Sequence, residues 1–244
     1  MKKLFAVLLS LCMLLACTAA LADTLTMGTN AQFQPYEFYE DGKIVGIDAE
    51  IAAAIAEKLG MELEIVDMDF GAIIPAVTEG KIDFGMAGMT VTEERLQSVN
   101  FSDTYAVGIQ AIIVKEGSEI KSYDDLAAEG ATWKVGVQES TTGDIYCTDE
   151  FGDARVEKYK AGPEAVEALK TGKVDCVIID NEPAKAFVAA NEGLQILDSK
   201  YAEEEYAIAV NLENKDLLDK INGALNELIT DGTVETIVAK YIHE

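Results

Sequence analysis

The sequence is poor in the residues on which most catalytic and metal sites depend. It has one histidine, His243, one tryptophan and four cysteines. No CxxC pair occurs, so the spacing of a cysteine zinc site is lacking. No internal histidine is available for a Ser/His/Asp or Cys/His constellation. These absences disfavour nucleophilic and metal-dependent enzymes, and we expect no metal and no cofactor.

Basic residues are also scarce, with 19 lysines and arginines against 44 acidic residues and a formal net charge of -25. This charge disfavours binding to nucleic acid or to an anionic membrane surface, and it favours a monomer. Disorder is not indicated, because 49% of the residues are hydrophobic and fall in periodic runs. Only Arg95 and Arg155 are arginines, so an arginine in a motif is informative.

The N-terminal residues have the pattern of an export signal. Lys2 and Lys3 precede an apolar run over residues 4–15, which is too short to span a bilayer. Ala20-Leu21-Ala22 predicts cleavage after residue 22, whereas Leu14-Leu15-Ala16-Cys17 resembles a lipobox that predicts a mature chain lipidated at Cys17. We therefore expect a signal peptide over 1–22, or over 1–16, and a location in the periplasm or on the outer face of the cytoplasmic membrane.

Short apolar segments alternate with helical patterns, which predicts an α/β fold with largely parallel sheets. Two cysteines, Cys147 and Cys176, remain for the folded part, either as a disulfide or as two buried thiols. Strands are expected over 24–29, 61–67, 83–88, 133–138 and 175–179, and helices over 47–59, 71–78, 143–150 and 163–171.

A local pattern occurs twice, over residues 78–83 and 170–175, each time as a helix stop that leads into a buried strand. It predicts two lobes of related design. Segments 109–114 and 206–211 lack Gly and Pro and are interpreted as connecting strands, and an amphipathic helix after them returns the chain to the first lobe. The expected lobes are 23–110 plus 207–244, and 111–206, which could close about a hinge.

Residues 85–95 end a predicted strand and begin a predicted helix, with Thr92 as its cap and Arg95 in its first turn. Free N–H groups and a guanidinium make a receptor for a carboxylate. The alternative is a surface ion pair of Arg95 with a neighbouring glutamate. Asp180 ends a strand of the second half and would face this receptor, although it could instead cap the next helix.

Several short motifs follow one another along the chain: Gly28-Thr29-Asn30, Phe33-x-Pro35-Tyr36-Glu37-Phe38, Gly42 to Asp48, Asp69-Phe70-x-x-Ile73-Ile74-Pro75-Ala76, Ala87 to Arg95, Asp103-x-Tyr105 and Asp175-x-Val177-x-Ile179-Asp180. Taken in this order, they resemble the polar amino acid branch of the extracytoplasmic solute-binding proteins that serve ABC importers. The resemblance covers essentially the whole mature chain and implies a type II periplasmic-binding-protein fold, two lobes joined by two hinge strands.

The resemblance implies a role for each matching residue. Arg95 would hold a ligand α-carboxylate with the backbone and hydroxyl of Thr90 and the turn at Thr141 and Thr142. Asp180 and the Gly88 carbonyl would hold the α-ammonium. Phe33 and Phe70 would pack on the two faces of the apolar stem of the ligand side chain. Met89, in the same turn as Gly88, is also expected at the site. Ordinary core packing is the alternative for the two phenylalanines.

The residues expected around the ligand side chain leave two substrate classes open. Asn30 and Gln138 form an uncharged pair that suits a polar side chain such as that of glutamine. Glu37 or Glu139, if directed inward, would favour a cationic side chain such as that of arginine. The sequence does not choose between them.

The function that the resemblance implies is capture of a free polar L-amino acid and delivery to the transmembrane subunits of an ABC permease, without catalysis. One rival is an enzyme on the same fold that resembles cyclohexadienyl dehydratase, with Glu139 or Glu182 as general acid. Another is a soluble amino acid sensor that uses the same clamp.

Overall fold

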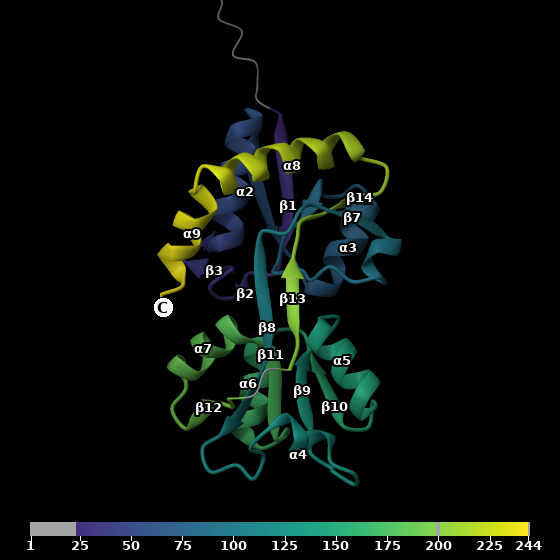
Figure 1. Ribbon diagram of the computed structural model, residues 1–244, viewed down its shortest axis with the longest axis vertical. Coiled ribbons are helices and arrows are strands. Elements are labelled where there is room, and N and C mark those ends of the chain that lie inside the picture. Colours follow the sequence, from purple (N-terminus) through teal and green to yellow (C-terminus); the bar gives the residue numbers. More distant parts are fainter. Residues whose placement is uncertain (1–22, 199–200, 244) are drawn as a thin grey trace, which may run out of the picture.

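The protein forms two α/β lobes, each built on its own sheet (Figure 1). The computed structural model describes residues 23–198 and 201–243. The expected signal peptide and Cys17 lie outside these residues. The first lobe's sheet has the order β5-β1-β6-β14-β7. Its strands are β1 (Thr24–Thr29), β5 (Glu62–Asp67), β6 (Phe84–Gly85), β7 (Val99–Phe101) and β14 (Ala209–Asn211).

In this sheet β1 runs parallel to β5 and β6, whereas β14 pairs antiparallel with β6 and β7. A small three-stranded sheet leads from β1 into the first helix. That sheet and the helices of the lobe are β2 (Gln32–Phe33), β3 (Glu37–Glu40), β4 (Lys43–Val45), α2 (Ile47–Leu59), α3 (Phe70–Thr78), α8 (Lys215–Thr230) and α9 (Thr233–Tyr241).

The second lobe has a mixed sheet of order β10-β9-β11-β8-β12, with β13 paired to β8. Strand β9 is parallel to β10 and β11, and β8 is antiparallel to its partners. Its elements are β8 (Ala106–Lys115), α4 (Tyr123–Ala127), β9 (Val135–Gln138), α5 (Thr142–Phe151), β10 (Val156–Tyr159), α6 (Gly162–Thr171), β11 (Cys176–Asp180), α7 (Asn181–Ala190), β12 (Leu194–Ile196) and β13 (Glu203–Tyr206).

Helix α2 shows why local sequence determines these elements. Ile47, Ile51 and Ile55 recur every four residues, and all three are buried on the face that packs into the core. The helix ends at Gly60, whose φ of 68 lets its N–H turn back to the Ala56 and Glu57 carbonyls. The predicted helix over 47–59 and its stop at Gly60 are confirmed.

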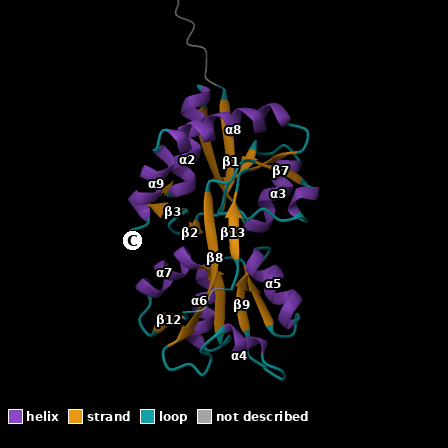
Figure 2. Ribbon diagram, in the orientation of Figure 1, coloured by secondary structure: helices purple, strands orange, loops and turns teal. Residues whose placement is uncertain are grey.

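The long strand β8 and the shorter β13 run side by side through the middle of the molecule, between the lobes (Figure 2). The prediction of one connecting strand over 206–211 is wrong, because the chain leaves the β8 ladder at Tyr206 and re-forms pairing only at Ala209. The reason lies at residues 207 and 208, whose N–H groups donate to the Met89 carbonyl and to Ser102 Oγ of the first lobe.

The prediction for residues 83–95 is also wrong in part. Strand β6 covers only Phe84–Gly85, and no α-helix begins at Arg95, where a 3-10 helix spans Arg95–Gln97 before β7 starts at Val99. Gly88 has a φ of 53 and bends the chain out of the strand direction. Thr92 nevertheless caps the turn, since its Oγ1 accepts from the Arg95 N–H at 3.1 Å.

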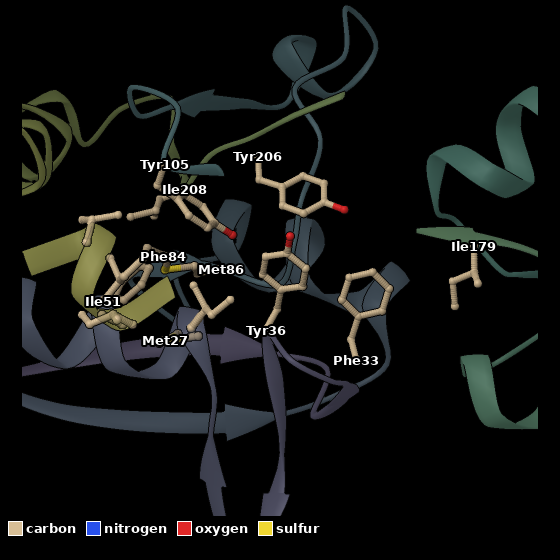
Figure 3. Packing of buried hydrophobic residues seen from close by; sticks show 14 of the residues in the cluster. Met27, Phe33, Tyr36, Ile51, Phe84, Met86, Tyr105, Ile179, Tyr206 and Ile208 are labelled. Carbon is tan, nitrogen blue, oxygen red and sulfur yellow. The ribbon is translucent and has the colours of Figure 1, made fainter. Parts of the chain in front are cut away.

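The largest core cluster of the described residues reaches from the first lobe into the second, where it includes Ile113 of β8, Leu169 of α6 and Val177 of β11 (Figure 3). Met27, Ile51 and Phe84 pack around the sheet, and the aromatic rings of Tyr36 and Tyr206 extend this packing toward the second lobe. Their centroids lie 5.2 Å apart in an edge-to-face arrangement. Helices α8 and α9 pack on α2 (Figure 1), so the predicted return of the chain to the first lobe is confirmed.

Cys147 and Cys176 are both free thiols, so the structure takes the second of the two alternatives. Both are fully buried in the core of the second lobe, with Val135 and Ile178. Burial raises the pKa of the Cys147 thiol to about 12, so it stays protonated. Within residues 23–198 and 201–243, we find no helix with the length and apolar character needed to cross a membrane.

Replacing Ile51 by alanine is expected to destabilise the protein by about 2 to 5 kcal/mol, because it removes a fully buried side chain and leaves a cavity under α2. Ile229→Ala is the matched control, since Ile229 is 43% exposed, and it should cost under about 0.5 kcal/mol. Urea unfolding monitored by circular dichroism measures both. Similar costs for the two variants would contradict this assignment of the core.

Candidate functional site

A narrow cavity, lined mainly by polar residues, lies between the lobes. Every residue predicted for the ligand site lines it except Met89. Both lobes contribute to the lining, which consists of Asn30, Phe33, Glu37, Phe70, Ala87, Gly88, Thr90, Arg95, Gln138, Thr141, Thr142 and Asp180. Met89 is fully buried in a separate hydrophobic cluster with Ile73 and Val77, because the side chains of consecutive extended residues point to opposite sides.

The guanidinium of Arg95 is buried and joins the two lobes. It donates from Nη1 to the Thr90 carbonyl at 2.7 Å and from Nη2 to the Ser140 carbonyl at 3.0 Å. Its Cζ lies 5.3 Å from the centroid of the Phe70 ring. Burial lowers the pKa of Arg95 from its ordinary value, but arginine keeps its charge. The alternative of a surface ion pair is therefore wrong, since Arg95 faces the cavity and is 7% exposed.

Thr90 offers the cavity a backbone donor rather than a hydroxyl proton. It forms an isolated β-bridge with Tyr206, in which the hydrogen bonds come from the N–H groups of Val91 and Ala207. The N–H of Thr90 thus takes no part in the bridge. Its hydroxyl donates to Glu204 Oε2 at 3.0 Å. The Thr90 Oγ1 can still accept a hydrogen bond from the cavity, because it keeps lone pairs.

Asp180 ends β11 and points its carboxylate into the cavity wall. Its side chain makes no helix-capping bond, so the capping alternative is wrong. Instead Oδ1 accepts from the Tyr206 hydroxyl and Oδ2 accepts from Gln110 Nε2 at 3.0 Å. Burial, followed by the charge of nearby Glu204, raises the pKa of Asp180 to about 7. An arriving cation would stabilise the ionised form.

Gln110 and Glu204 are functional neighbours that sequence reasoning missed. Glu204 is 4% exposed and accepts from Gln110 Nε2 at 3.1 Å, so one amide serves two carboxyl groups. Residues 203–206 of β13 alternate exposed and buried in the structure, so Glu204 lies on the same inward face of the strand as the buried Tyr206.

The remaining lining residues shape the cavity. Gln138 Nε2 donates to Asn30 Oδ1 at 3.0 Å and so bridges the two lobes. Thr141 caps α5, whose N-terminus opens beside the cavity, and Thr142 follows it there. Gly88 permits close approach of Phe33, since a Cβ at that position would lie 2.8 Å from the Phe33 ring.

Of the two glutamates considered for a cationic side chain, only Glu37 lines the cavity. It is 1% exposed, and the buried Asp48 lies behind it. Glu139 points elsewhere, because its carboxylate pairs with Lys160 at 2.5 Å and is 45% exposed. Among residues 23–198 and 201–243, no group of His, Cys, Asp and Glu has an arrangement that could hold a metal ion.

Two α/β lobes, two strands between them and a buried polar cavity at their contact define a two-lobed ligand-binding protein of the type II periplasmic class. The chain belongs to the bacterial extracellular solute-binding proteins, family 3, whose model matches residues 25–244.

Similar proteins cover nearly all of the chain. It is 33% identical to the arginine-binding extracellular protein ArtP of Bacillus subtilis (strain 168), over 99% of this chain and 98% of that protein. A solved structure of an ancestral arginine-binding protein bound to glutamine is 44% identical with a TM-score of 0.85, and covers 91% of this chain and 98% of that one. The same comparison with an ancestral arginine-binding protein bound to arginine gives 44% identity and a TM-score of 0.85, over 91% of this chain and 100% of that one.

These comparisons confirm the predicted class: the protein is an exported solute-binding component of an amino acid ABC transporter and not an enzyme. The two carboxyl groups that the enzyme rival required have other partners. Glu139 pairs with Lys160, and Glu182 pairs with Lys185 at 2.6 Å. Neither lines the cavity.

Asp180→Asn should flatten the pH dependence of stability in the ligand-free protein. A carboxyl group whose pKa is raised on folding stabilises most fully below its ordinary value of 3.8, and this contribution is lost as pH rises to about 7. An asparagine at position 180 does not titrate, so the free energy of unfolding should fall less as pH rises. Urea titrations between pH 4 and 8 measure this free energy, with the variant Asp216→Asn, at an exposed position, as control. An unchanged slope in Asp180→Asn would contradict a raised pKa.

Proposed function

We propose that the protein captures a free L-amino acid in the cavity between its lobes and delivers it to an ABC permease. The observation that carries this proposal is the placing of one buried cation, Arg95, and one buried carboxyl, Asp180, on the wall of the same cavity. An amino acid at neutral pH carries one charge of each sign. Each charge leaves water on binding and therefore needs a partner of opposite sign.

The α-carboxylate is assigned to Arg95, the backbone N–H of Thr90 and the α5 N-terminus at Thr141 and Thr142. In the ligand-free site the Arg95 guanidinium donates to two carbonyl oxygens. A carboxylate is a stronger acceptor than a carbonyl, because its hydrogen bonds are charge-assisted on both sides. The ligand would therefore take over part of these contacts and keep the lobes together.

The α-ammonium is assigned to Asp180, the Gly88 carbonyl and Thr90 Oγ1. Because the Thr90 hydroxyl proton is directed to Glu204, its oxygen presents a lone pair to a donor. An ammonium group would also keep Asp180 ionised at neutral pH, although burial opposes that charge. Phe33 and Phe70 are assigned to the apolar stem of the ligand.

For the ligand side chain we propose a cationic group, as in arginine, with glutamine as the alternative. Among the residues that the structure describes, Arg95 is the one cation that lines the cavity, whereas Glu37 and Asp180 line it as acids and Asp48 and Glu204 lie behind them. This excess of carboxyl groups favours a ligand that carries a net positive charge. The relatives named for arginine and the ancestral protein bound to glutamine are consistent with both side chains.

We further propose that the lobes, 23–110 plus 207–244 and 111–206, close on the ligand as a monomer and present the closed form to the permease. The strands β8 and β13 would act as the hinge. Lipidation of Cys17 would hold the protein at the outer face of the membrane, whereas cleavage after residue 22 would release it into the periplasm.

Arg95→Ala should lower amino acid affinity on the order of 100-fold or more, because the ligand carboxylate loses a buried cationic partner. Isothermal titration calorimetry on ligand-stripped protein measures the loss. Arg155→Ala is the matched control, since Arg155 donates to the Trp133 and Leu126 carbonyls in the second lobe. That variant should lose stability and keep its affinity. Undiminished binding in Arg95→Ala would overturn the carboxylate assignment.

A further inference from the structure

Two buried carboxyl groups, those of Glu37 and Asp48, lie close together beside the cavity. Glu37, at the start of β3, lines the cavity and is 1% exposed. Asp48, in the first turn of α2, lies behind it and is 0% exposed. The N–H of Asp48 donates to the carbonyl of Tyr36, the residue before Glu37, at 2.9 Å, so the two carboxyl groups are neighbours. Two ionised carboxylates have only acceptors, and a hydrogen bond between them would require a proton on one of them.

The unpaired oxygens of the two groups indicate such a proton. Glu37 Oε2 and Asp48 Oδ1 are buried, and among the described residues no N–H or O–H donor reaches either. Buried polar atoms are rarely left without a partner, because each one loses its hydrogen bonds to water on burial. One proton shared by the pair supplies the donor that neither side chain otherwise has.

The surroundings place this proton on Glu37. Asp48 Oδ2 accepts from the Gly88 N–H and from the Tyr105 hydroxyl, each at 2.8 Å, and these donors favour an ionised Asp48. Glu37 has no such donors. Burial and the Asp48 charge raise the pKa of Glu37 well above its ordinary value, whereas the pKa of Asp48 is about 6. At neutral pH the pair therefore carries one negative charge.

The other ionisable groups around the pair do not compensate a second charge. Burial and these carboxyl groups raise the pKa values of Tyr36 and Tyr105, which stay neutral. Asp67 of β5 and Asp180 of β11 act on Glu37 as like charges, and the charge of Glu182 in α7 acts on Tyr36. Arg95 lines the cavity but hydrogen-bonds to carbonyl groups at the α-carboxylate position. A cation beside Glu37 must come from the ligand.

We propose that Glu37 is a specificity-determining residue whose charge follows the ligand: it is protonated in the empty site and gives its proton to solvent when a cationic side chain enters. A guanidinium or ammonium group then faces a carboxylate, and the charge of the site is conserved. A neutral amide side chain leaves the proton in place and donates to the Glu37 carbonyl oxygen. This inference rests on the proposed function.

The linkage has a defined sign. Because binding of a cationic ligand releases a proton from Glu37, its affinity rises with pH until Glu37 ionises in the empty protein. The rise is about tenfold per pH unit for one released proton. Asp180 also releases protons when an α-ammonium binds, but it does so for every amino acid. The difference between arginine and glutamine therefore isolates Glu37.

The test is isothermal titration calorimetry of arginine and glutamine at pH 7 in two buffers of different ionisation enthalpy, which counts the protons released. We expect close to one more proton for arginine than for glutamine. Glu37→Gln should remove the difference. Glu139→Gln is the matched control and should keep it, because Glu139 pairs with Lys160 outside the cavity. Equal proton counts for two ligands that both bind would overturn the inference.

A second measurement needs no ligand and separates the inference from the proposed function. The infrared spectrum of the ligand-free protein at pH 7 should contain a protonated carboxylic acid band that Glu37→Gln lacks. If arginine and glutamine both fail to bind while this band is present, the proposed function fails and the shared proton stands. If the band is the same in both proteins, the inference fails whatever the ligand.

Discussion

The rest of the site depends on the buried guanidinium of Arg95. It is held by carbonyl groups of both lobes, those of Thr90 and Ser140, and it is the cation among residues that otherwise supply acids and neutral groups to the cavity. Burying such a charge is costly unless acceptors surround it. The carbonyl groups accept its hydrogen bonds in the absence of ligand, and a ligand carboxylate would offer the guanidinium a stronger interaction.

Acidic groups around this cation are arranged in two pairs, and in each pair a shared hydrogen-bond donor reduces the repulsion between the two buried carboxyl groups. Asp180 and Glu204 share the amide of Gln110. Glu37 and Asp48 share a proton. In both cases one more positive charge relieves the repulsion, which is the physical reason for the proposed ligand with an ammonium group and a cationic side chain. The same groups destabilise the empty protein relative to the bound one, and ligand binding is thereby linked to stability.

Much of the fold could be predicted from the sequence, because it follows from local periodicity. The four-residue spacing of Ile47, Ile51 and Ile55 and the stop at Gly60 determine α2, and the buried run that ends at Asp180 determines β11. The segment over 206–211 could not be predicted, because its break depends on hydrogen bonds to Met89 and Ser102, more than a hundred residues away in sequence. The role of Glu204 could not be predicted for a related reason, because it depends on hydrogen bonds from Thr90 and Gln110, which are far away in sequence.

In the proposed function, one cavity binds both charges of a free amino acid. The decisive measurement is calorimetric titration of ligand-stripped protein with arginine, with its α-deaminated analogue and with its methyl ester. Arginine should bind tightly, and removal of either α-group should weaken binding on the order of 100-fold or more. Undiminished affinity for the deaminated compound or for the ester would contradict the proposed function.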